Sequence, residues 1–251
     1  MNARKPWQGM LAIARFNWPF YVAAATVFIG AGAACMILSE LVPRLALAAV
    51  LAGAAYFVFG SLGVSHLIYD RSDLYRWRWL ERVLPGPAPQ RAVFCHCGFD
   101  ETSTALRARF PSTEWLILDH YDPTVMTEPS IRRARRQFPP SADTLVTSYD
   151  HWPVASGTVE AVFGMLAIHE LRSSIARSAW FAEARRCLCP NGRIVLAEHV
   201  RDAANFLAFG PGFLHFHSRE NWRGAWQSAR LRCADEFRVT PWVRIWVLEP
   251  V

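Results

Sequence analysis

The sequence has 251 residues, of which 52% are hydrophobic and only 19% are charged. Soluble domains carry about 25% charged residues, so this chain is unusually apolar. Its aromatic content of 13%, with 14 glycines and 16 prolines, excludes intrinsic disorder and collagen-like repeats. The formal net charge of +6 comes almost wholly from arginine, and the densest basic stretch, residues 132–136, has the pattern of a solvated helix face. We therefore expect no nucleic-acid partner, because nucleic-acid binders gather their charge on one face.

Two long uncharged runs account for the apolar excess. The first lies between Arg15 and Glu40, and the second covers residues 45–69. A helix rises about 1.5 Å per residue, so about 20 such residues cross a hydrocarbon core of about 30 Å. The runs predict transmembrane helices at about 17–38 and 45–67, joined by a short turn. The alternative is a buried helical hairpin within a soluble domain.

Basic residues flank this hairpin on both sides. They are Arg4, Lys5 and Arg15 before the first run, and Arg71, Arg76, Arg78 and Arg82 after the second. Basic flanks stay on the cytoplasmic side, so we expect a multi-pass protein of the inner (cytoplasmic) membrane with its C-terminal part in the cytoplasm. A signal peptide is a poorer interpretation, because the first run is too long for an h-region and a second run follows it.

Aromatic residues alternate with arginines directly after the second run, at Tyr69, Tyr75, Trp77 and Trp79. Such residues settle at the level of lipid headgroups, which favours an interfacial collar or a short amphipathic helix. The alternative is that these aromatic rings pack on the domain that follows. The sequence leaves both interpretations open.

A proline-rich stretch at 84–90 divides the chain into a membrane-anchor region with its interfacial segment, residues 1–83, and a second domain, residues 84–251. In the second domain, short β-type runs alternate with helical ones. We expect strands at 92–96, 115–119, 144–147, 159–165, 193–199, 233–239 and 243–248, and helices at 102–110, 128–138 and 174–187. This alternation predicts an α/β fold with a mostly parallel sheet covered on both faces.

Ligands bind at the carboxyl ends of the strands in open sheets of this kind, so the strand ends are the expected site. Each of the first five expected strands leads to ionisable side chains. In strand order these are His96 and Asp100, Asp119 and His120, Asp150 and His151, His169 and Glu170, and Glu198 and His199.

These features resemble the class I S-adenosylmethionine-dependent methyltransferases, particularly the small-molecule branch that includes the quinone-biosynthesis methyltransferases. The resemblance covers residues 91–248 and is carried by three features. These are the acidic residue Asp119 closing the second strand, the segment 150–153 (Asp-His-Trp-Pro), and the run 181–198, with Pro-Asn-Gly at 190–192 as the turn before the fifth strand. The resemblance implies a Rossmann-like methyltransferase sheet with S-adenosyl-L-methionine as its cofactor.

The resemblance also implies which residues bind the cofactor. They are His96, Gly98, Asp100, Asp119, His120, Asp150 and His151. Asp119 is expected to accept hydrogen bonds from the ribose hydroxyls and Asp150 from the adenine amino group, although either carboxylate could instead cap a turn or helix. The first-strand loop departs from the family, because Gly98 is its single glycine where relatives have several. Asp100 either meets the amino group of the cofactor or caps the following helix.

Three residues are candidates for the chemistry: His169, Glu170 and His199. A histidine of ordinary pKa, near 6.5, can remove a proton from an acceptor during methyl transfer, and Glu170 could orient the imidazole. The alternative for His169 and Glu170 is a purely structural role, with Glu170 paired to Arg172. Glu198 and His199 form a second acid–imidazole pair on the next strand.

The segment 205–217 is unusually apolar for a connection near an active site. It predicts a substrate lid or a membrane-touching wall, with His215 and His217 either lining it or packed within it. We expect no metal site, because the histidines and carboxylates show no compact ligand spacing. The six cysteines are interpreted as reduced residues of a cytoplasmic domain.

The expected function is methyl transfer from S-adenosyl-L-methionine to a hydrophobic small molecule or lipid in the membrane, such as a quinone precursor. The hairpin motivates this class of acceptor, since a soluble substrate would not require two spans. The alternatives are transfer of another group from the same cofactor, and a non-catalytic binding module tethered to the membrane.

Overall fold

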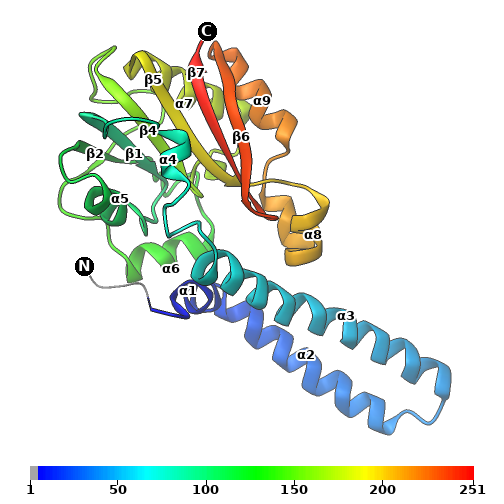
Figure 1. Ribbon diagram of the computed structural model, residues 1–251. Coiled ribbons are helices and arrows are strands. Elements are labelled where there is room, and N and C mark those ends of the chain that lie inside the picture. Colours follow the sequence, from blue (N-terminus) through cyan, green and yellow to red (C-terminus); the bar gives the residue numbers. More distant parts are fainter. Residues whose placement is uncertain (1–4) are drawn as a thin grey trace.

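The computed structural model describes residues 5–251, so the basic residue Arg4 lies outside the described residues. Figure 1 shows an α/β body from which a long helical hairpin projects. In chain order the elements are α1 (Gln8–Phe16), α2 (Trp18–Ile37), α3 (Leu41–His66), the π-helical turn η1 (Leu67–Arg71), α4 (Leu80–Val83), β1 (Arg91–His96), α5 (Ser103–Arg109), β2 (Glu114–Asp119), α6 (Pro129–Gln137), β3 (Thr144–Val146), β4 (Val159–Met165), the 3-10 turn η2 (Ile168–Glu170), α7 (Ser174–Cys187), β5 (Leu188–His199), α8 (Ala203–Phe209), the 3-10 turn η3 (Gly210–His215), α9 (Arg219–Ser228), β6 (Leu231–Thr240) and β7 (Val243–Pro250).

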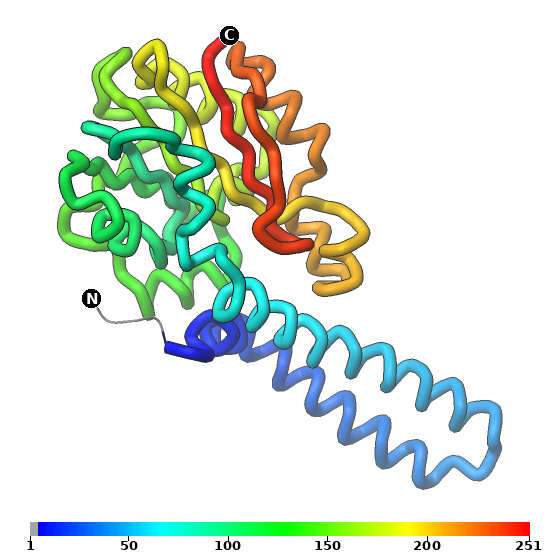
Figure 2. Tube along the Cα trace, viewed as in Figure 1, coloured from blue at the N-terminus to red at the C-terminus, as the bar shows by residue number. Residues whose placement is uncertain are grey.

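Helices α2 and α3 form the projecting hairpin, close to the two predicted apolar segments (Figure 2). Both are long and apolar enough to cross a membrane. The most apolar windows of α2 and α3 are 0% and 6% buried in the protein. Buried core helices lose their contact with solvent, so the alternative of a buried hairpin within a soluble domain is wrong. The hairpin presents its apolar surface outward, as a candidate pair of membrane spans.

Helix α1 precedes the hairpin and was not among the predicted elements. It packs on α6, where the ring of Phe16 lies 5.3 Å from that of Phe99 and 6.1 Å from that of Phe138. The guanidinium Nε of Arg133 donates a hydrogen bond to the carbonyl of Phe16 at 2.5 Å. The arginine-rich stretch is therefore only partly the solvated face that the sequence predicted, because α6 uses Arg133 to hold α1.

The sheet has the strand order β3-β2-β1-β4-β5-β7-β6. Strands β1 to β5 are parallel and β7 runs antiparallel to both β5 and β6. Successive residues of β1 serve opposite faces: Val93 and Cys95 join the cluster with α7 and α9, whereas Ala92 and Phe94 join the cluster with residues 68–83. Such alternation is the mark of a strand covered on both faces, so the predicted mostly parallel α/β sheet is confirmed.

The aromatic segment after α3 packs on the second face of the sheet. Leu74 and Leu80 are fully buried, Trp77 and Trp79 are 7% exposed, and all four belong to the same hydrophobic cluster as β1 and β4. Between the two open interpretations, the structure thus favours packing on the domain over an interfacial collar. The hydrophobic packing of the α/β body begins before the proline-rich stretch.

The turn η1 joins the hairpin to the rest of the protein through Asp70. Its carboxylate accepts hydrogen bonds from the backbone N–H groups of Gly9 at 2.7 Å and Met10 at 3.1 Å, and pairs with Nδ1 of His66 at 3.0 Å. The N–H groups of a first helical turn have no partner within the helix, so a buried carboxylate there fixes the start of α1. The base of α3 and α1 are therefore held together.

The predicted turn at residues 190–192 occurs inside β5 as an irregularity. Val159 of β4 pairs with Leu188 and Ala161 pairs with Arg193, so β5 bulges between these two pairings. A Cβ on Gly192 would come within 2.9 Å of the carbonyl of Val159, which is closer than carbon and oxygen approach. Glycine at this position therefore lets the bulge lie against β4.

Candidate functional site

The carboxyl ends of β1, β2, β4 and β5 meet where the chain switches direction across the sheet, between β1 and β4. Ligands of open α/β sheets bind at this kind of switch point. Two groups of side chains lie here. One surrounds Asp119 at the end of β2, and the other surrounds His169 just after β4.

Asp119 ends β2 with a wholly buried side chain. Its Oδ1 accepts hydrogen bonds from the backbone N–H of Gly98 at 2.8 Å and of Tyr121 at 3.0 Å. Its Oδ2 is paired with the guanidinium of Arg135 from α6. A carboxylate offers about four lone-pair sites, so Oδ2 could accept from a ligand hydroxyl if Arg135 turned away.

The loop after β1 comes close to the loop after β2 at Gly98. This residue has a φ of +90°, and a Cβ on it would lie 2.7 Å from the ring of Tyr121 and 3.2 Å from the side chain of Ile131. Only glycine fits such a backbone and such crowding without strain. In this arrangement Tyr121 and Ile131 fill the space beside Gly98.

Two of the other predicted cofactor residues, His96 and His120, are buried beside Asp119. Nδ1 of His96 lies 3.4 Å from Oδ1 of Asp119, and burial lowers the pKa of His96 although the Asp119 charge opposes this. The ring of His120 stacks on Trp152 and its Nδ1 lies 3.1 Å from the carbonyl of Thr147. Burial lowers the pKa of His120 to about 4, so this ring is neutral and packs as part of the core.

Asp100 is committed to the start of α5. Its carboxylate accepts hydrogen bonds from the backbone N–H groups of Thr102 at 3.0 Å and Ser103 at 2.9 Å, and also from the Ser103 hydroxyl. Of the two roles left open for this residue, the structure supports the helix cap. Because the oxygens of Asp100 satisfy the first turn of α5, its contact with the amino group of a cofactor stays a prediction.

Asp150 and His151 are exposed on the loop after β3. The Asp150 carboxylate accepts a hydrogen bond from the hydroxyl of Ser148, and the His151 carbonyl accepts one from the hydroxyl of Thr147 at 2.8 Å. These bonds order the loop at the same edge of the sheet as Asp119. The assignment of Asp150 to an adenine amino group stays a prediction.

The second group is organised by Glu198, which is buried near the end of β5. Its Oε1 accepts hydrogen bonds from the backbone N–H groups of Ala167, Ile168 and His169 at 3.1, 2.8 and 3.2 Å, and its Oε2 lies 2.7 Å from Nδ1 of His169. The expected pair of Glu198 with His199 does not form, because adjacent residues of a strand point to opposite faces. Glu198 instead fixes both the turn η2 and the ring of His169.

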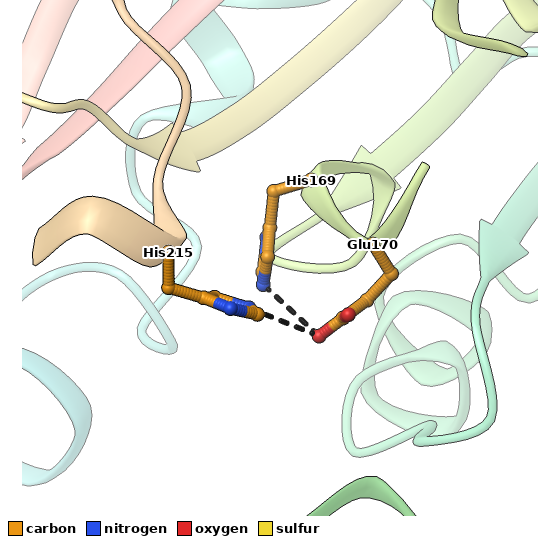
Figure 3. A group of neighbouring side chains, drawn as sticks. All are labelled: His169, Glu170 and His215. Carbon is orange, nitrogen blue, oxygen red and sulfur yellow. Dashed lines mark hydrogen bonds and ion pairs between the residues drawn. The ribbon is translucent and has the colours of Figure 1, made fainter. Parts of the chain in front are cut away.

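His169, Glu170 and His215 converge from η2 and η3, as Figure 3 shows. Oε1 of Glu170 lies 3.4 Å from Nε2 of His169 and 3.3 Å from Nε2 of His215. Nδ1 of His215 lies 3.2 Å from a carboxylate oxygen of Glu128, which stands just before α6. Glu170 therefore does not pair with Arg172, whose guanidinium bonds the carbonyls of His169 and His215.

This arrangement shifts the pKa of each member. Burial by itself would lower the pKa of His169, but the charges of Glu198 and Glu170 and their hydrogen bonds outweigh it and raise the pKa to about 10. Burial opposes ionisation of Glu170, yet hydrogen bonds from His169 and His215 lower its pKa. Burial alone would also lower the pKa of His215, but its hydrogen bonds with Glu128 and Glu170 raise it. In the absence of other ligands His169 is an imidazolium at neutral pH, which does not suit the predicted general base.

The sequence predicted no metal site, but the donor atoms of His169, Glu170 and His215 all lie within 4.8 Å of one another. Two of these residues are adjacent and the third is 45 positions away, so no compact spacing reveals the group. Glu128 and Arg135 were also missed, since nothing in the local sequence sets them apart from ordinary surface charges. The structure thus replaces the expectation of no metal site with a compact set of possible ligands.

His199, the third predicted catalytic residue, is fully engaged elsewhere. Its Nδ1 lies 3.0 Å from the carbonyl of Trp242 and 3.1 Å from Oδ1 of Asn205, and its Nε2 lies 2.9 Å from the hydroxyl of Tyr69. Burial, and then the positive charge of His169, lower the pKa of His199 to about 4. Both nitrogens of this ring have hydrogen-bond partners within the protein, which favours a structural role, and the catalytic role of His199 stays a prediction.

The apolar connection α8–η3 lies between the cluster and the hairpin. Gly210, with a φ of +54°, is so close to Phe57 of α3 that a Cβ would lie 2.9 Å from its ring. Leu207 and Leu214 of this connection are 57% and 55% exposed. His215 belongs to η3, whereas His217 is buried against Arg177 and the carbonyl of His169, so only His215 reaches the cluster.

Comparisons with known proteins agree with this fold. No protein-family model matches the sequence, and no curated protein matches it. Among solved structures, one similar to this chain is geranyl diphosphate C-methyltransferase from Streptomyces coelicolor, in complex with Mg²⁺, geranyl diphosphate and S-adenosyl-L-homocysteine. The comparison has a TM-score of 0.53 and 15% sequence identity, and it covers 77% of this chain and 84% of that chain. A SAM-dependent methyltransferase from Aquifex aeolicus has a TM-score of 0.52 and 13% identity, covering 72% and 90%. The chain therefore has the Rossmann-like fold of S-adenosylmethionine-dependent methyltransferases.

The residues around Asp119 can be tested against the cofactor of that fold. A buried carboxylate at the end of β2 and a glycine at the end of β1 suit a nucleoside ribose and the close approach of its substituent. A shallow hollow of about 320 Å³, open to solvent, lies on the adjacent surface and is lined by Tyr121, Arg132, Arg135 and Arg136, with Asp119 and Gly98 covered beneath it. In this structure Arg135 covers Oδ2 of Asp119 and Tyr121 fills the space beside Gly98, so a nucleoside cofactor would reach these groups only after both side chains move.

Proposed function

We propose that this protein is a membrane-anchored, S-adenosylmethionine-dependent methyltransferase that acts on a hydrophobic acceptor held in the bilayer. The observation that carries the cofactor half of the proposal is the buried Asp119 carboxylate at the end of β2, facing the positive-φ loop at Gly98. In this fold that edge of the sheet receives nucleosides. When bound, the cofactor supplies an electrophilic methyl group on sulfur.

The roles of this chain's residues follow from their geometry. Asp119 would accept the ribose hydroxyls, and Gly98 would let the backbone approach the methionine part. The cluster of His169, Glu170 and His215 lies beside the same strand ends and would orient the nucleophilic atom of the acceptor. Since the hydrogen bonds of Glu198 fix η2, the cluster is held in place before an acceptor arrives.

The acceptor half of the proposal rests on the path from hairpin to cluster. α3 contacts α8, and Phe57 of α3 lies against Gly210 and Phe206 of the α8–η3 connection. The exposed Leu207 and Leu214 extend this apolar surface, and the following residue, His215, belongs to the cluster. An acceptor in the bilayer beside α3 would therefore lie next to the apolar connection that leads to His215. This supports a lipid or quinone-like acceptor over a soluble one, with the α/β body on the cytoplasmic side.

Calorimetric titration of the purified full chain with S-adenosyl-L-methionine and S-adenosyl-L-homocysteine tests the cofactor claim. We expect both to bind, and Asp119→Asn to abolish binding while the protein stays folded. Asp122→Asn is the matched control, because Asp122 is exposed and its hydrogen bonds to Thr124 stay within its own turn. Absence of binding to either compound would favour a non-catalytic module instead.

Two further measurements test the membrane and the acceptor. We expect the chain to remain with membranes after alkaline carbonate washing, as integral proteins do. Comparative mass spectrometry of lipid extracts from cells with and without the gene should reveal a lipid that carries one additional methyl group. A different mass gain would indicate transfer of another group from the same cofactor.

A further inference from the structure

The cluster of His169, Glu170 and His215 has the spacing of ligands around a metal ion. Charge-assisted N–H···O hydrogen bonds measure about 2.7–2.9 Å. The two inner contacts of Glu170 Oε1, at 3.4 Å to His169 Nε2 and 3.3 Å to His215 Nε2, are longer than that. An ion with bonds of about 2.05 Å in tetrahedral geometry holds its ligand atoms about 3.3 Å apart. Two of the three separations therefore match the edge of such a polyhedron, and all three donor atoms lie within 4.8 Å of one another.

The outer partners of the two imidazoles reinforce this interpretation. Nδ1 of His169 lies 2.7 Å from Oε2 of Glu198, and Nδ1 of His215 lies 3.2 Å from Oε1 of Glu128. A carboxylate on Nδ1 holds a proton there and directs the lone pair of Nε2 to the opposite side of the ring. Carboxylate–histidine–metal arrangements of this kind orient the histidines of established metal sites. Here both Nε2 atoms face Glu170.

The donor set also indicates the kind of ion. Imidazole nitrogen suits zinc, iron, copper and nickel, whereas magnesium and calcium prefer oxygen ligands throughout. Two histidines with one carboxylate leave a coordination position open, as in catalytic zinc sites. The side chains of His169, Glu170 and His215 are 11%, 12% and 26% exposed, so that position is reachable from outside.

We propose that His169, Glu170 and His215 form a binding site for a divalent transition-metal ion, Zn²⁺ in the first instance, with Glu198 and Glu128 as its outer partners. The two turns that carry the ligands are held by hydrogen bonds, η2 by its backbone N–H groups to Glu198 and η3 by the bond from Arg172 to the His215 carbonyl.

The role of the ion rests on that proposed function. A divalent ion in the open site would bind the oxygen of a hydroxyl acceptor, whose proton would leave to solvent, and would stabilise the deprotonated oxygen, which is the better nucleophile. The existence of the site, by contrast, is independent of the transfer reaction.

Metal titration of the tag-free full chain in detergent, after chelator treatment and dialysis, tests the site without any cofactor present. We expect one Zn²⁺ per chain by calorimetry. Co²⁺ should give the visible absorption of a four- or five-coordinate ion, which a small anion such as azide shifts by entering the open position. Mg²⁺ should bind far more weakly than Zn²⁺.

Variants separate the site from incidental binding. Because losing an outer partner costs about 10- to 100-fold in affinity, we expect Glu128→Gln to weaken Zn²⁺ binding about tenfold, and Glu170→Gln and His215→Gln to weaken it by more than about 100-fold. His151→Gln and Cys233→Ser remove an exposed histidine and an exposed thiol outside the cluster and should bind Zn²⁺ like the parent. Circular dichroism of each metal-free variant checks that it is folded.

The proposal fails if the folded parent binds no Zn²⁺, or if the Glu170 and His215 variants bind it as tightly as the parent does. It also fails if Mg²⁺ binds as tightly as Zn²⁺, because the site would then not be selective for a transition metal. If the parent binds Zn²⁺ but no S-adenosyl-L-methionine, the proposed function is overturned and the metal site stands.

Discussion

Tyr69, in the π-helical turn that ends the second apolar helix, shares a hydrogen bond of 2.9 Å with His199 at the end of β5, 130 residues further along the chain. Nδ1 of His199 faces the carbonyl of Trp242 and therefore carries the proton, so Nε2 accepts from the Tyr69 hydroxyl. The contact ties the base of the hairpin directly to a central strand. The hydrogen bond therefore couples the base of the hairpin to the strand end next to the candidate site.

Substituting Tyr69→Phe removes this donor and leaves a buried acceptor on His199. We expect a loss of about 1–2 kcal/mol in the free energy of unfolding, the usual cost of an unsatisfied buried group. Thermal unfolding of the full chain in detergent measures it. Tyr56→Phe is the control, because Tyr56 is 55% exposed and its loss of a hydroxyl should leave the unfolding midpoint unchanged. An equal shift in both variants would contradict the proposed link.

Arg135 and a cofactor ribose would compete for Oδ2 of Asp119. Replacing Arg135 by alanine removes the competitor, so S-adenosyl-L-methionine should bind about tenfold more tightly, since a hydrogen bond to a charged group contributes about 1.5–3 kcal/mol. Calorimetric titration measures this. Arg223→Ala, which removes an exposed arginine of α9 away from Asp119, should leave the affinity unchanged. Weaker binding in Arg135→Ala would mean that the guanidinium contacts the ligand and does not exclude it.

Gly98 should tolerate no side chain. In Gly98→Ala the strain of the positive φ adds to the clash of the new Cβ with the Tyr121 ring at 2.7 Å. We expect the free energy of unfolding to fall by about 1–3 kcal/mol and cofactor binding to be lost. Gly224→Ala provides the matched control, because a Cβ there meets open space within α9. Alanine is the better helix former, so that variant should be stabilised by about 0.5–1 kcal/mol. Equal stability of Gly98→Ala and the parent by denaturant unfolding would show that Tyr121 moves freely.

The stability of the α/β body should depend on pH through His120. Its pKa is about 4 in the folded protein because of burial, against an ordinary value of 6.5. The unfolded chain therefore binds a proton at higher pH than the folded one, and stability falls as the pH decreases from 6.5 to 4. The contribution is about 3 kcal/mol, at about 1.4 kcal/mol per pH unit.

Replacing His120 by asparagine should make this dependence shallower by the part that His120 contributes, while His199, whose pKa is also about 4, keeps its own part. The asparagine amide can still donate to the Thr147 carbonyl that Nδ1 of His120 faces, and it does not titrate. Denaturant unfolding at a series of pH values compares the two slopes. His151→Asn, which removes an exposed histidine, should keep the slope of the parent. Parallel curves for the parent and His120→Asn would contradict the assignment.

Local sequence patterns predicted the apolar hairpin and the mostly parallel sheet. The hydropathy runs located α2 and α3 because a run of apolar residues is a property of consecutive positions, and helix geometry converts its length directly into a span. The alternation of β-type and helical segments gave the parallel sheet for the same reason. The short amphipathic helix α1 was missed, because its apolar residues are buried only by packing against Phe99 and Phe138 of the α/β body.

The candidate site was predicted only in part. Asp119 and Gly98 were located because the ends of parallel strands meet at one edge of a sheet, whatever the side chains do there. The partners of the cluster were not predicted from the sequence. Strand register places Glu198 beside His169, and the paths of two loops place Glu128 and His215 beside each other. Neighbours in the sequence, such as Glu198 and His199, were paired wrongly because a strand sends them to opposite faces.

Two apolar helices followed by an α/β sheet with polar strand ends could be read from the order of residues, because each of these features is a pattern of consecutive positions. The exposure of the hairpin, the cover of Arg135 over Asp119 and the convergence of two histidines and a glutamate after β4 are visible only in the folded protein. These contacts depend on strand register, pleat and loop path, which bring together residues as far apart as 45 and 130 positions.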